Sequence, residues 1–266
     1  MTSNDYFGID TPEGIEGRRL ARLEAVSDPI TVSRLTRLGV APGWRCLEVG
    51  AGGGSIARWL ADRVGPEGSV VATDLDMRFL AHADLGPVEV RRHDILTDPL
   101  ETDAFDLVHA RALLMNLPDP QLALRRLAAA VKPGGILFVE DADWSSLSSL
   151  DPTIESEFHR LSHAGFQALR AARISDGYFG RRLLGLVESI GFEHVEGDGI
   201  VRMGRGGADP WGQFQSMNLQ LPIATSLVSK GIMTQADLDW LRATYANPEF
   251  SFLGFTLFGA WARKPA

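Results

Sequence analysis

The sequence predicts an α/β protein with a mostly parallel sheet of about seven strands, helices on both faces and helical additions that form a cap. Two observations carry this prediction. Between residues 45 and 140, short apolar runs alternate with segments of helical periodicity, and a glycine-rich turn joins the first run to the helix after it. Strands that alternate with helices are typical of parallel sheets covered on both faces. The chain of 266 residues is long enough for one large domain with inserted or appended segments.

The first residues are expected to form an N-terminal helical segment, or lid, over positions 1–39. Apolar residues recur at helical spacing from Ile15 to Leu38, and Pro29 interrupts them. A proline inside a helix lacks the backbone N–H that the helical ladder needs. The pattern therefore predicts two short helices that end at Gly39.

The next elements alternate regularly. Strands are expected over residues 45–49, 69–73, 88–92, 105–110 and 136–140, with helices over residues 55–64, 77–82 and 120–131. Asp119 and Pro120 occupy the cap and first-turn positions that these residue types favour. A turn at residues 132–135 should lead into the fifth strand.

The second half of the chain is less regular. Helices are expected over residues 152–171 and 179–190, a strand over 192–201, mostly helix over 209–245 and a final alternating strand over 252–261. We therefore expect one domain over residues 40–266, with helical cap insertions at about 145–178 and 208–248.

Composition excludes several classes of partner. The formal net charge of −8 argues against nucleic acid, because phosphate binding needs clustered Lys and Arg. No stretch is long and apolar enough to span a bilayer, and no basic amphipathic stretch indicates membrane binding. The sequence lacks a signal pattern, and its only cysteine, Cys46, lies in an apolar run typical of a buried thiol. We therefore expect a cytoplasmic protein. Whether it forms a homo-oligomer is left open by the sequence.

The strongest local signal is the turn at residues 47–55, which has glycines at 50, 52 and 54 between a strand and a helix. Glycines let the backbone turn sharply and approach a ligand. The dinucleotide fingerprint asks for a glycine where Ser55 stands. Glu48 also fits poorly beside a pyrophosphate, but it suits a ligand whose nearby end is positively charged. A tight turn without a ligand is the alternative.

Two further acids follow neighbouring strands. Asp74 comes after the second strand and Asp94 after the third, where Ile95 follows it. Ligands of open α/β sheets bind beyond the carboxyl ends of the strands. Together with Glu48, these acids therefore predict a single binding site at one edge of the sheet.

These segments resemble the successive motifs of class I S-adenosylmethionine-dependent methyltransferases. The resemblance covers roughly residues 40–145 and rests on residues 46–54, 71–76, 92–95, 105–116 and 132–140. It implies a Rossmann-like sheet of seven strands whose last strand is antiparallel. The segment 106–111 is especially similar to the branch that modifies small metabolites, which includes ubiquinone-type and natural-product enzymes. The resemblance thus implies transfer of a methyl group from S-adenosylmethionine, with S-adenosylhomocysteine as product, to O, N or C of a small organic metabolite.

By position, the resemblance also implies the cofactor contacts. The methionine portion would meet Glu48, Gly50 and Gly52, the ribose Asp74, and the adenine Leu75, Asp94 and Ile95. Ala51 and His93 are further expected cofactor contacts. The wall beyond the fourth strand would consist of His109, Ala110 and Arg111. Tyr6, beside Gly8, is a candidate for a lid residue over the bound cofactor.

The catalytic and substrate-binding residues are less sharply indicated. Alignment alone can lower a barrier by about 7–11 kcal/mol, so a general base is useful but not obligatory. Candidates for catalysis are His109, Arg111 and His159, and candidates for substrate binding are Asn116, Asp143, Trp144 and His163. Packing, a surface ion pair or a solvated helix face is the alternative for each of these residues. Apart from His159 and His163, no His or Cys lies at the spacing of metal ligands. We therefore expect no bound metal ion.

Two other functions compete with methyl transfer. A protein that binds the cofactor without transferring its methyl group would carry the same motifs. A nicotinamide-dependent oxidoreductase is disfavoured by Glu48 and Ser55, and by the lack of a Tyr-x-x-x-Lys pair.

Overall fold

The structure is a computed structural model that describes residues 14–81 and 83–266. The chain divides into two compact units. Unit 1 contains residues 14–27, 143–178 and 200–256, and unit 2 contains residues 28–142, 179–199 and 257–266. Both segments expected to form cap insertions, 145–178 and 208–248, fall in unit 1. Tyr6, the expected lid residue, lies outside the described residues.

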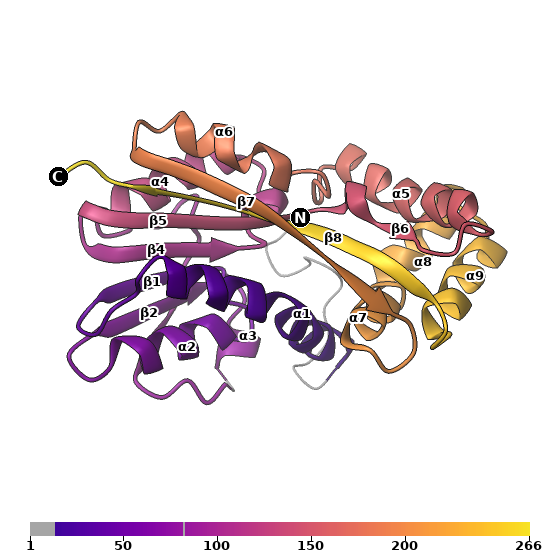
Figure 1. The fold of residues 1–266 in the computed structure, drawn as a ribbon, viewed down its shortest axis with the longest axis horizontal. Coiled ribbons are helices and arrows are strands. Elements are labelled where there is room, and N and C mark those ends of the chain that lie inside the picture. Colours follow the sequence, from indigo (N-terminus) through magenta and orange to yellow (C-terminus); the bar gives the residue numbers. More distant parts are fainter. Residues whose placement is uncertain (1–13, 82) are drawn as a thin grey trace. The chain divides into compact units, whose positions relative to one another are not determined.

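The sheet has the strand order β3-β2-β1-β4-β5-β8-β6, and β7 pairs with β8 (Figure 1). The strands are β1 (Arg45–Val49), β2 (Ser69–Asp74), β3 (Val88–Arg92), β4 (Phe105–Arg111), β5 (Val131–Asp143), β6 (Ser148–Ser149), β7 (Glu193–Arg205) and β8 (Ser251–Arg263). The pairs from β3 to β5 are parallel. This confirms the predicted α/β class with a mostly parallel sheet.

The described sheet has eight strands where seven were expected. The unexpected strand, β6, consists of two residues that pair antiparallel with Phe252 and Leu253 of β8. So short a strand has no periodicity of its own, and only its pairing defines it.

In unit 2, alternate residues of the strands point to two apolar layers. One layer packs Leu47, Val71 and Val108 against helices α4 (Pro120–Ala130) and α6 (Leu183–Glu188). The other packs Cys46, Val70 and Leu107 against α2 (Ser55–Val64) and the end of α1 (Ile15–Arg37). Neighbours such as Cys46 and Leu47 thus face opposite sides of a sheet that has helices on both faces.

Local capping signals set the starts of two helices in unit 2. The carboxylate of Asp119 accepts a hydrogen bond from the N–H of Leu122, 2.9 Å away, and Pro120 begins α4, as predicted. The short helix α3 (Met77–Leu80) starts after Asp76, whose side chain accepts from the N–H of Arg78.

Several bounds differ from the sequence prediction, and two of these differences have a clear physical cause. Helix α1 continues through Pro29 as one helix, where two helices were expected. Its residues on either side of the proline, such as Ser27 and Thr31, are buried, so tertiary packing outweighs the lost backbone bond. The predicted turn at 132–135 is part of β5, because Gly134 donates to the carbonyl of Lys264, the residue directly after β8.

Unit 1 is mainly helical. It contains α5 (Glu155–Ala171), α7 (Pro210–Asn218), α8 (Pro222–Ser229) and α9 (Gln235–Ala246), together with β6 and the first part of β8. Aromatic side chains fill its interior: Trp144 contacts Phe166, Phe214 and Phe255, with ring centroids 4.6, 6.2 and 4.8 Å away. A capping box of Thr234 and Asp237 begins α9.

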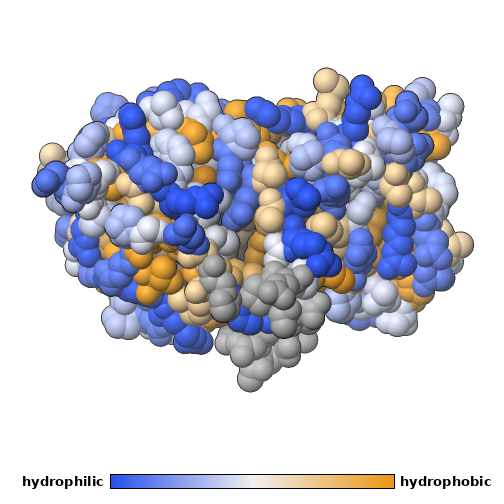
Figure 2. All heavy atoms as spheres, turned by 90° about the horizontal axis from the view of Figure 1, so that it is seen from below, coloured by the Kyte–Doolittle hydropathy of each residue, from blue (hydrophilic) through white to orange (hydrophobic). Residues whose placement is uncertain are grey.

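The surface is mixed in character. Hydrophilic side chains cover much of the face shown in Figure 2, with apolar residues between them.

The thiol of Cys46 is buried, and burial raises its pKa well above the usual range, which fits an inert core residue. Among the helices of the described residues, none has the length and apolar character needed to cross a membrane.

Candidate cofactor site and its buried polar network

The glycine-rich turn after β1 has a backbone that side chains would obstruct. Gly50, Gly52 and Gly54 all have positive φ, at 73°, 56° and 84°. A Cβ on Gly50 would lie 3.1 Å from the side chain of Leu113, and one on Gly54 would lie 2.6 Å from that of Leu85. The turn therefore needs glycine at these positions for both conformation and space.

Asp74, at the end of β2, is joined to this turn. Its Oδ2 accepts a hydrogen bond from the N–H of Gly52 and its Oδ1 one from the N–H of Asp76, both at 2.9 Å. Burial raises the pKa of Asp74, although these backbone donors oppose the shift. The structure thus brings together the first two predicted elements of the site.

The end of β3 adjoins the end of β2. The N–H of His93 donates to the carbonyl of Asp74, and Asp94 caps the following turn by accepting from the N–H of Leu96. Ile95 is buried, whereas Leu75 and Asp94 are half-buried. The imidazole of His93 is buried, and neither ring nitrogen has a hydrogen-bond partner in the described part of the chain. A buried imidazole without partners is costly and suits a polar ligand group.

The turn after β4 closes over the glycines. Ala112 has a φ of 53°, a left-handed conformation that is uncommon for a residue with a side chain. Its N–H donates to the carbonyl of Glu140, and its carbonyl accepts from the amide of Asn116, each at 2.8 Å. These bonds place Leu113 over Gly50 and give Asn116 a structural partner.

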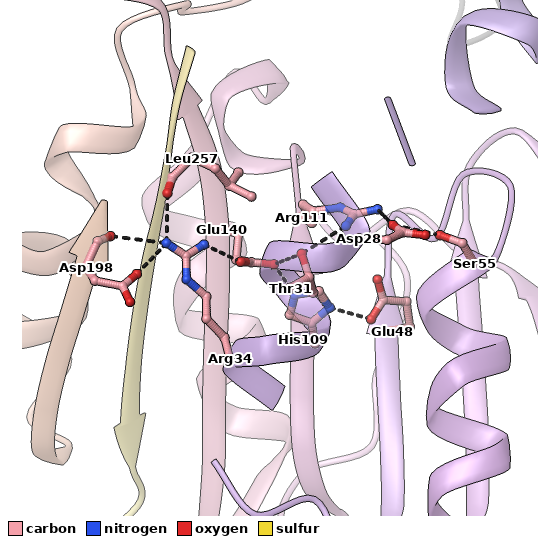
Figure 3. A network of polar contacts seen from close by, with 10 residues as sticks. All are labelled: Asp28, Thr31, Arg34, Glu48, Ser55, His109, Arg111, Glu140, Asp198 and Leu257. Atoms are coloured by element: carbon pink, nitrogen blue, oxygen red, sulfur yellow. Dashed lines mark hydrogen bonds and ion pairs between the residues drawn. The ribbon is translucent and has the colours of Figure 1, made fainter. Parts of the chain in front are cut away.

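A row of buried ionisable side chains crosses the sheet behind the turn (Figure 3). His109 lies between two carboxylates: its Nδ1 is 2.6 Å from Oε2 of Glu48, and its Nε2 is 3.1 Å from Oε2 of Glu140. Burial by itself would lower the pKa of His109, but the two carboxylates outweigh it and raise the pKa to about 9. The imidazole is therefore protonated at neutral pH and donates to both acids.

The second half of α1 continues the row. Thr31 donates to Oε2 of Glu140 at 2.6 Å, and Arg34 donates to Oε1 at 2.5 Å. Arg34 also donates to the carbonyl of Leu257, 2.8 Å away, and pairs with Asp198 of β7. Burial acts to raise the pKa of Glu140, but His109 and Arg34 outweigh it and hold the pKa below its usual value.

Arg111 extends the network to the start of α2. Its guanidinium donates to Thr31 at 2.9 Å and to Asp28 at 2.7 Å, and Asp28 in turn accepts from the hydroxyl of Ser55 at 3.1 Å. Arg111 thus has protein partners on both sides, and it joins α1 to the edge of the glycine turn.

The remaining predicted residues lie in unit 1 and do not join this network. Asp143 is buried and accepts from the N–H and the hydroxyl of Ser145. His159 and His163 share one face of α5, as predicted, with ring centroids 4.0 Å apart. His159 is exposed, whereas His163 and Trp144 are buried.

Sequence reasoning missed half of the network. Asp28, Thr31 and Arg34 read only as polar positions of a helix, and Asp198 as part of a predicted strand. Asp141, which the sequence places beside the substrate-binding candidates Asp143 and Trp144, is completely buried, and burial raises its pKa well above the usual range. The sequence did contain one signal of this network, the two acids Glu140 and Asp141 at the end of an apolar run. Acids that are buried there need partners from elsewhere in the fold.

No group of three or more His, Cys, Asp and Glu side chains in the described ranges is arranged to hold a metal ion. His109, Glu48 and Glu140 do meet, but both ring nitrogens of His109 are already engaged with carboxylates.

The described residues form an open α/β sheet with a glycine turn and acids at neighbouring strand ends, and ligands of such sheets bind beyond the carboxyl ends of the strands. Residues 47–139 match the protein family described as "Methyltransferase domain". The described chain has the Rossmann-like α/β fold that the sequence predicted, and a solved structure described as a methyltransferase shares this fold.

Two relatives from other organisms match part of this chain. A 37.1 kDa protein of transposon TN4556 from Streptomyces fradiae is 31% identical over 222 residues, which are 82% of this chain and 62% of the relative. Methyltransferase str2 of Strobilurus tenacellus is 34% identical over 130 residues, 47% of this chain and 46% of the relative. The chain therefore spans less than two thirds of the length of these relatives.

Solved structures share the fold at low identity. A Bacillus halodurans C-125 protein assigned to the methyltransferases superposes with a TM-score of 0.59, with 20% identity over 88% of this chain and 98% of that one. The [4+2]-cyclase SpnF superposes with a TM-score of 0.54, with 19% identity over 90% of this chain and 81% of that one. The same fold thus carries different reactions.

Proposed function

We propose that the protein binds S-adenosylmethionine at the carboxyl ends of β1 to β4 and transfers its methyl group to O, N or C of a small organic metabolite. The observation that carries the proposal is the bond between Asp74 and the N–H of Gly52, which holds a carboxylate at the edge of an open glycine turn. The match of residues 47–139 to a methyltransferase domain supports it.

The residues at the site fit this cofactor. Asp74 has carboxylate lone pairs beyond its two backbone bonds for ribose hydroxyls. His93 and Asp94 supply polar atoms for an adenine, and Ile95 and Leu75 supply apolar surface. Glu48 pairs with His109 through Oε2, and we expect its other oxygen, Oε1, to accept from the ammonium end of the cofactor. We expect the glycine backbone at positions 50–52 to approach the methionine portion.

S-adenosylmethionine supplies an activated methyl group, so the main task of this chain is to align the reactants and exclude water. Alignment of this kind is worth about 7–11 kcal/mol. The network from Glu48 through His109 to Arg34 fixes the strand ends against α1. We assign His109 a positioning role, because it is completely buried and holds its proton between two carboxylates. Arg111 has a similar role through Asp28 and Thr31.

Titration calorimetry with the purified chain tests the cofactor part of the proposal. We expect S-adenosylmethionine and S-adenosylhomocysteine to bind with one-to-one stoichiometry, and NAD to show no binding. Release of S-adenosylhomocysteine during incubation with a panel of small phenols, amines and carbon acids then tests methyl transfer. Binding of NAD in place of S-adenosylmethionine would contradict the proposal.

A second candidate function is cofactor binding without methyl transfer. The presence of a [4+2]-cyclase among proteins of this fold favours keeping it. It predicts tight binding of the cofactor and no S-adenosylhomocysteine with any acceptor. Methyl transfer to any one acceptor would exclude this second function, provided that a variant unable to bind the cofactor no longer transfers the methyl group.

A further inference from the structure

Unit 1 contains a cleft of about 590 Å³, and all the residues that line it belong to this unit. Part of the lining comes from α9, where Trp240, Ala243 and Thr244 lie three or four positions apart and so share one face of the helix. The rest comes from positions 150, 151 and 154, which follow β6, and from positions 247 and 249–251, which lead into β8. The volume is within the range of about 300–1,000 Å³ that suits small organic ligands.

The cleft offers apolar surface to a ligand. Trp240 is half-buried, and its indole makes no ring contact or hydrogen bond with other described residues. Leu150 is 44% exposed and Ile154 is half-buried. Phe250, by contrast, is buried, and its ring stacks on that of Phe252 with centroids 5.3 Å apart. The lining thus combines a fixed aromatic residue with an indole whose surface is available for binding.

The charged residues of the lining are both acids, Asp151 and Glu249, and no described Lys, Arg or His lines the cleft. Oδ1 of Asp151 accepts from the N–H and the hydroxyl of Thr153, at 2.9 and 2.7 Å, whereas its Oδ2 has no hydrogen bond within the described chain. Thr153 holds the pKa of Asp151 below its usual value, so the carboxylate is ionised at neutral pH. The carboxylate of Glu249 likewise has no partner among the described residues. Both acids therefore have oxygens free to accept from a ligand.

The C-terminal end of α9 adds to this negative potential. Partial negative charge collects at the C-terminus of a helix, and the last turn of α9, which contains Ala243 and Thr244, has no basic residue. The hydroxyl of Thr244 donates to the carbonyl of Trp240 at 2.9 Å, so its lone pairs are left to accept. The helix end and the two carboxylates thus favour the same kind of ligand, one with positive charge.

We propose that this cleft binds a small organic cation, a protonated amine on an aromatic or apolar body. The ammonium group donates to the free oxygens of Asp151 and Glu249, and the body of the ligand packs against Trp240 and Leu150. The proposal does not depend on methyl transfer, because it concerns unit 1 alone. The described residues that are expected to contact the cofactor belong to unit 2.

Other classes of ligand fit the cleft less well. A metal ion needs several converging ligands, and among the described residues no group of three or more His, Cys, Asp and Glu is arranged to hold one. Both acids repel an anion. A quaternary ammonium ion has no N–H to donate to the free carboxylate oxygens, whereas a protonated amine supplies charge and donors together.

NMR titration of the full chain with three probes of similar shape tests the proposal. The probes are 2-phenylethylamine, which is cationic at neutral pH, the neutral 2-phenylethanol and the anionic phenylacetate. We expect the amine to shift the indole N–H signal of Trp240, which its loss in Trp240→Leu identifies, and to bind about 10-fold more tightly than the alcohol. Phenylacetate should leave the signal unchanged. Added salt should weaken binding of the amine but not of the alcohol, because it screens exposed charges.

Charge-neutral variants assign the effect to the two acids. Asp151→Asn keeps Oδ1 as an acceptor for Thr153 and removes the charge, and Glu249→Gln does the same for the second acid. Together they should weaken binding of the amine about 5- to 10-fold and leave binding of the alcohol unchanged, which also shows that the cleft is intact. Glu188→Gln, an exposed acid of α6 in unit 2, is the control and should bind the amine like the wild type. The proposal is overturned if the amine does not bind, if amine and alcohol bind equally, or if the double variant keeps the wild-type affinity for the amine.

Discussion

Nδ1 of His109 lies 2.6 Å from Oε2 of Glu48, and β1 and β4 place the two residues directly opposite each other in register. The pairing of these strands thus determines an ion pair at the base of the glycine turn. Because Glu140 accepts from the other ring nitrogen, the imidazolium holds β1, β4 and β5 together at their carboxyl ends.

The first prediction concerns pH. The pKa of His109 is raised from 6.5 to about 9, so the folded protein binds this proton more tightly than the unfolded chain does. The stabilisation is fully present below pH 6.5 and is lost as the pH rises through about 9. It amounts to about 3 kcal/mol, which urea denaturation at several pH values would measure. Stability that stays constant from pH 6 to pH 10 would contradict it.

NMR provides an independent check on the same residue. Both ring N–H protons of His109 should be observable at neutral pH, because each nitrogen donates to a carboxylate. Replacement by phenylalanine should remove the pH dependence and destabilise the protein by about 3–5 kcal/mol, since two buried carboxylates lose their shared partner.

The second prediction compares two arginines that pair with the same acid. Arg34 and Arg37 both contact Asp198, but their side chains are 1% and 58% exposed. Arg34→Ala should lower the free energy of unfolding by about 3–5 kcal/mol, because Glu140 loses a buried partner. Arg37→Ala should change it by less than about 1 kcal/mol. Denaturant titrations of both variants measure the difference. Similar losses of unfolding free energy in the two variants would show that burial of the arginine does not determine how much its ion pairs contribute.

The third prediction separates space from backbone strain at the glycine turn. Gly54 and Gly39 have nearly the same φ, 84° and 80°, but a Cβ would meet Leu85 at 2.6 Å only at Gly54 and nothing within 4 Å at Gly39. Gly39→Ala should cost about 1–2 kcal/mol from strain alone. Gly54→Ala should cost about 1–3 kcal/mol more because of overpacking, as thermal or urea denaturation would show.

The fourth prediction concerns the ribose-binding carboxylate. Asp74→Ala should weaken S-adenosylmethionine binding about 10- to 100-fold, because hydrogen bonds to a charged group contribute about 1.5–3 kcal/mol. Asp62→Ala, on the exposed surface of α2, is the control and should bind like the wild type. Calorimetry gives both affinities, and circular dichroism checks that the fold is intact. Unchanged affinity in Asp74→Ala would remove this residue from the site.

The acids at or near the ends of the first three strands could be found from sequence because they depend on local order. A parallel sheet brings the carboxyl ends of its strands to one edge, so Glu48, Asp74 and Asp94 fall at neighbouring strand ends once the strands are recognised. Residue type and spacing thus sufficed for seven of the eight described strands and for the glycine turn, whereas the cofactor contacts stay predictions.

The sequence by itself determined the α/β class, the strand ends and the need for glycine at the turn, because periodicity and backbone sterics act over a few residues. Only the tertiary structure decided that α1 continues through Pro29, that His109 lies between Glu48 and Glu140, and that Arg34 reaches Asp198, 164 positions away. A buried charge must find its partner wherever the fold places one, and no local pattern records that choice.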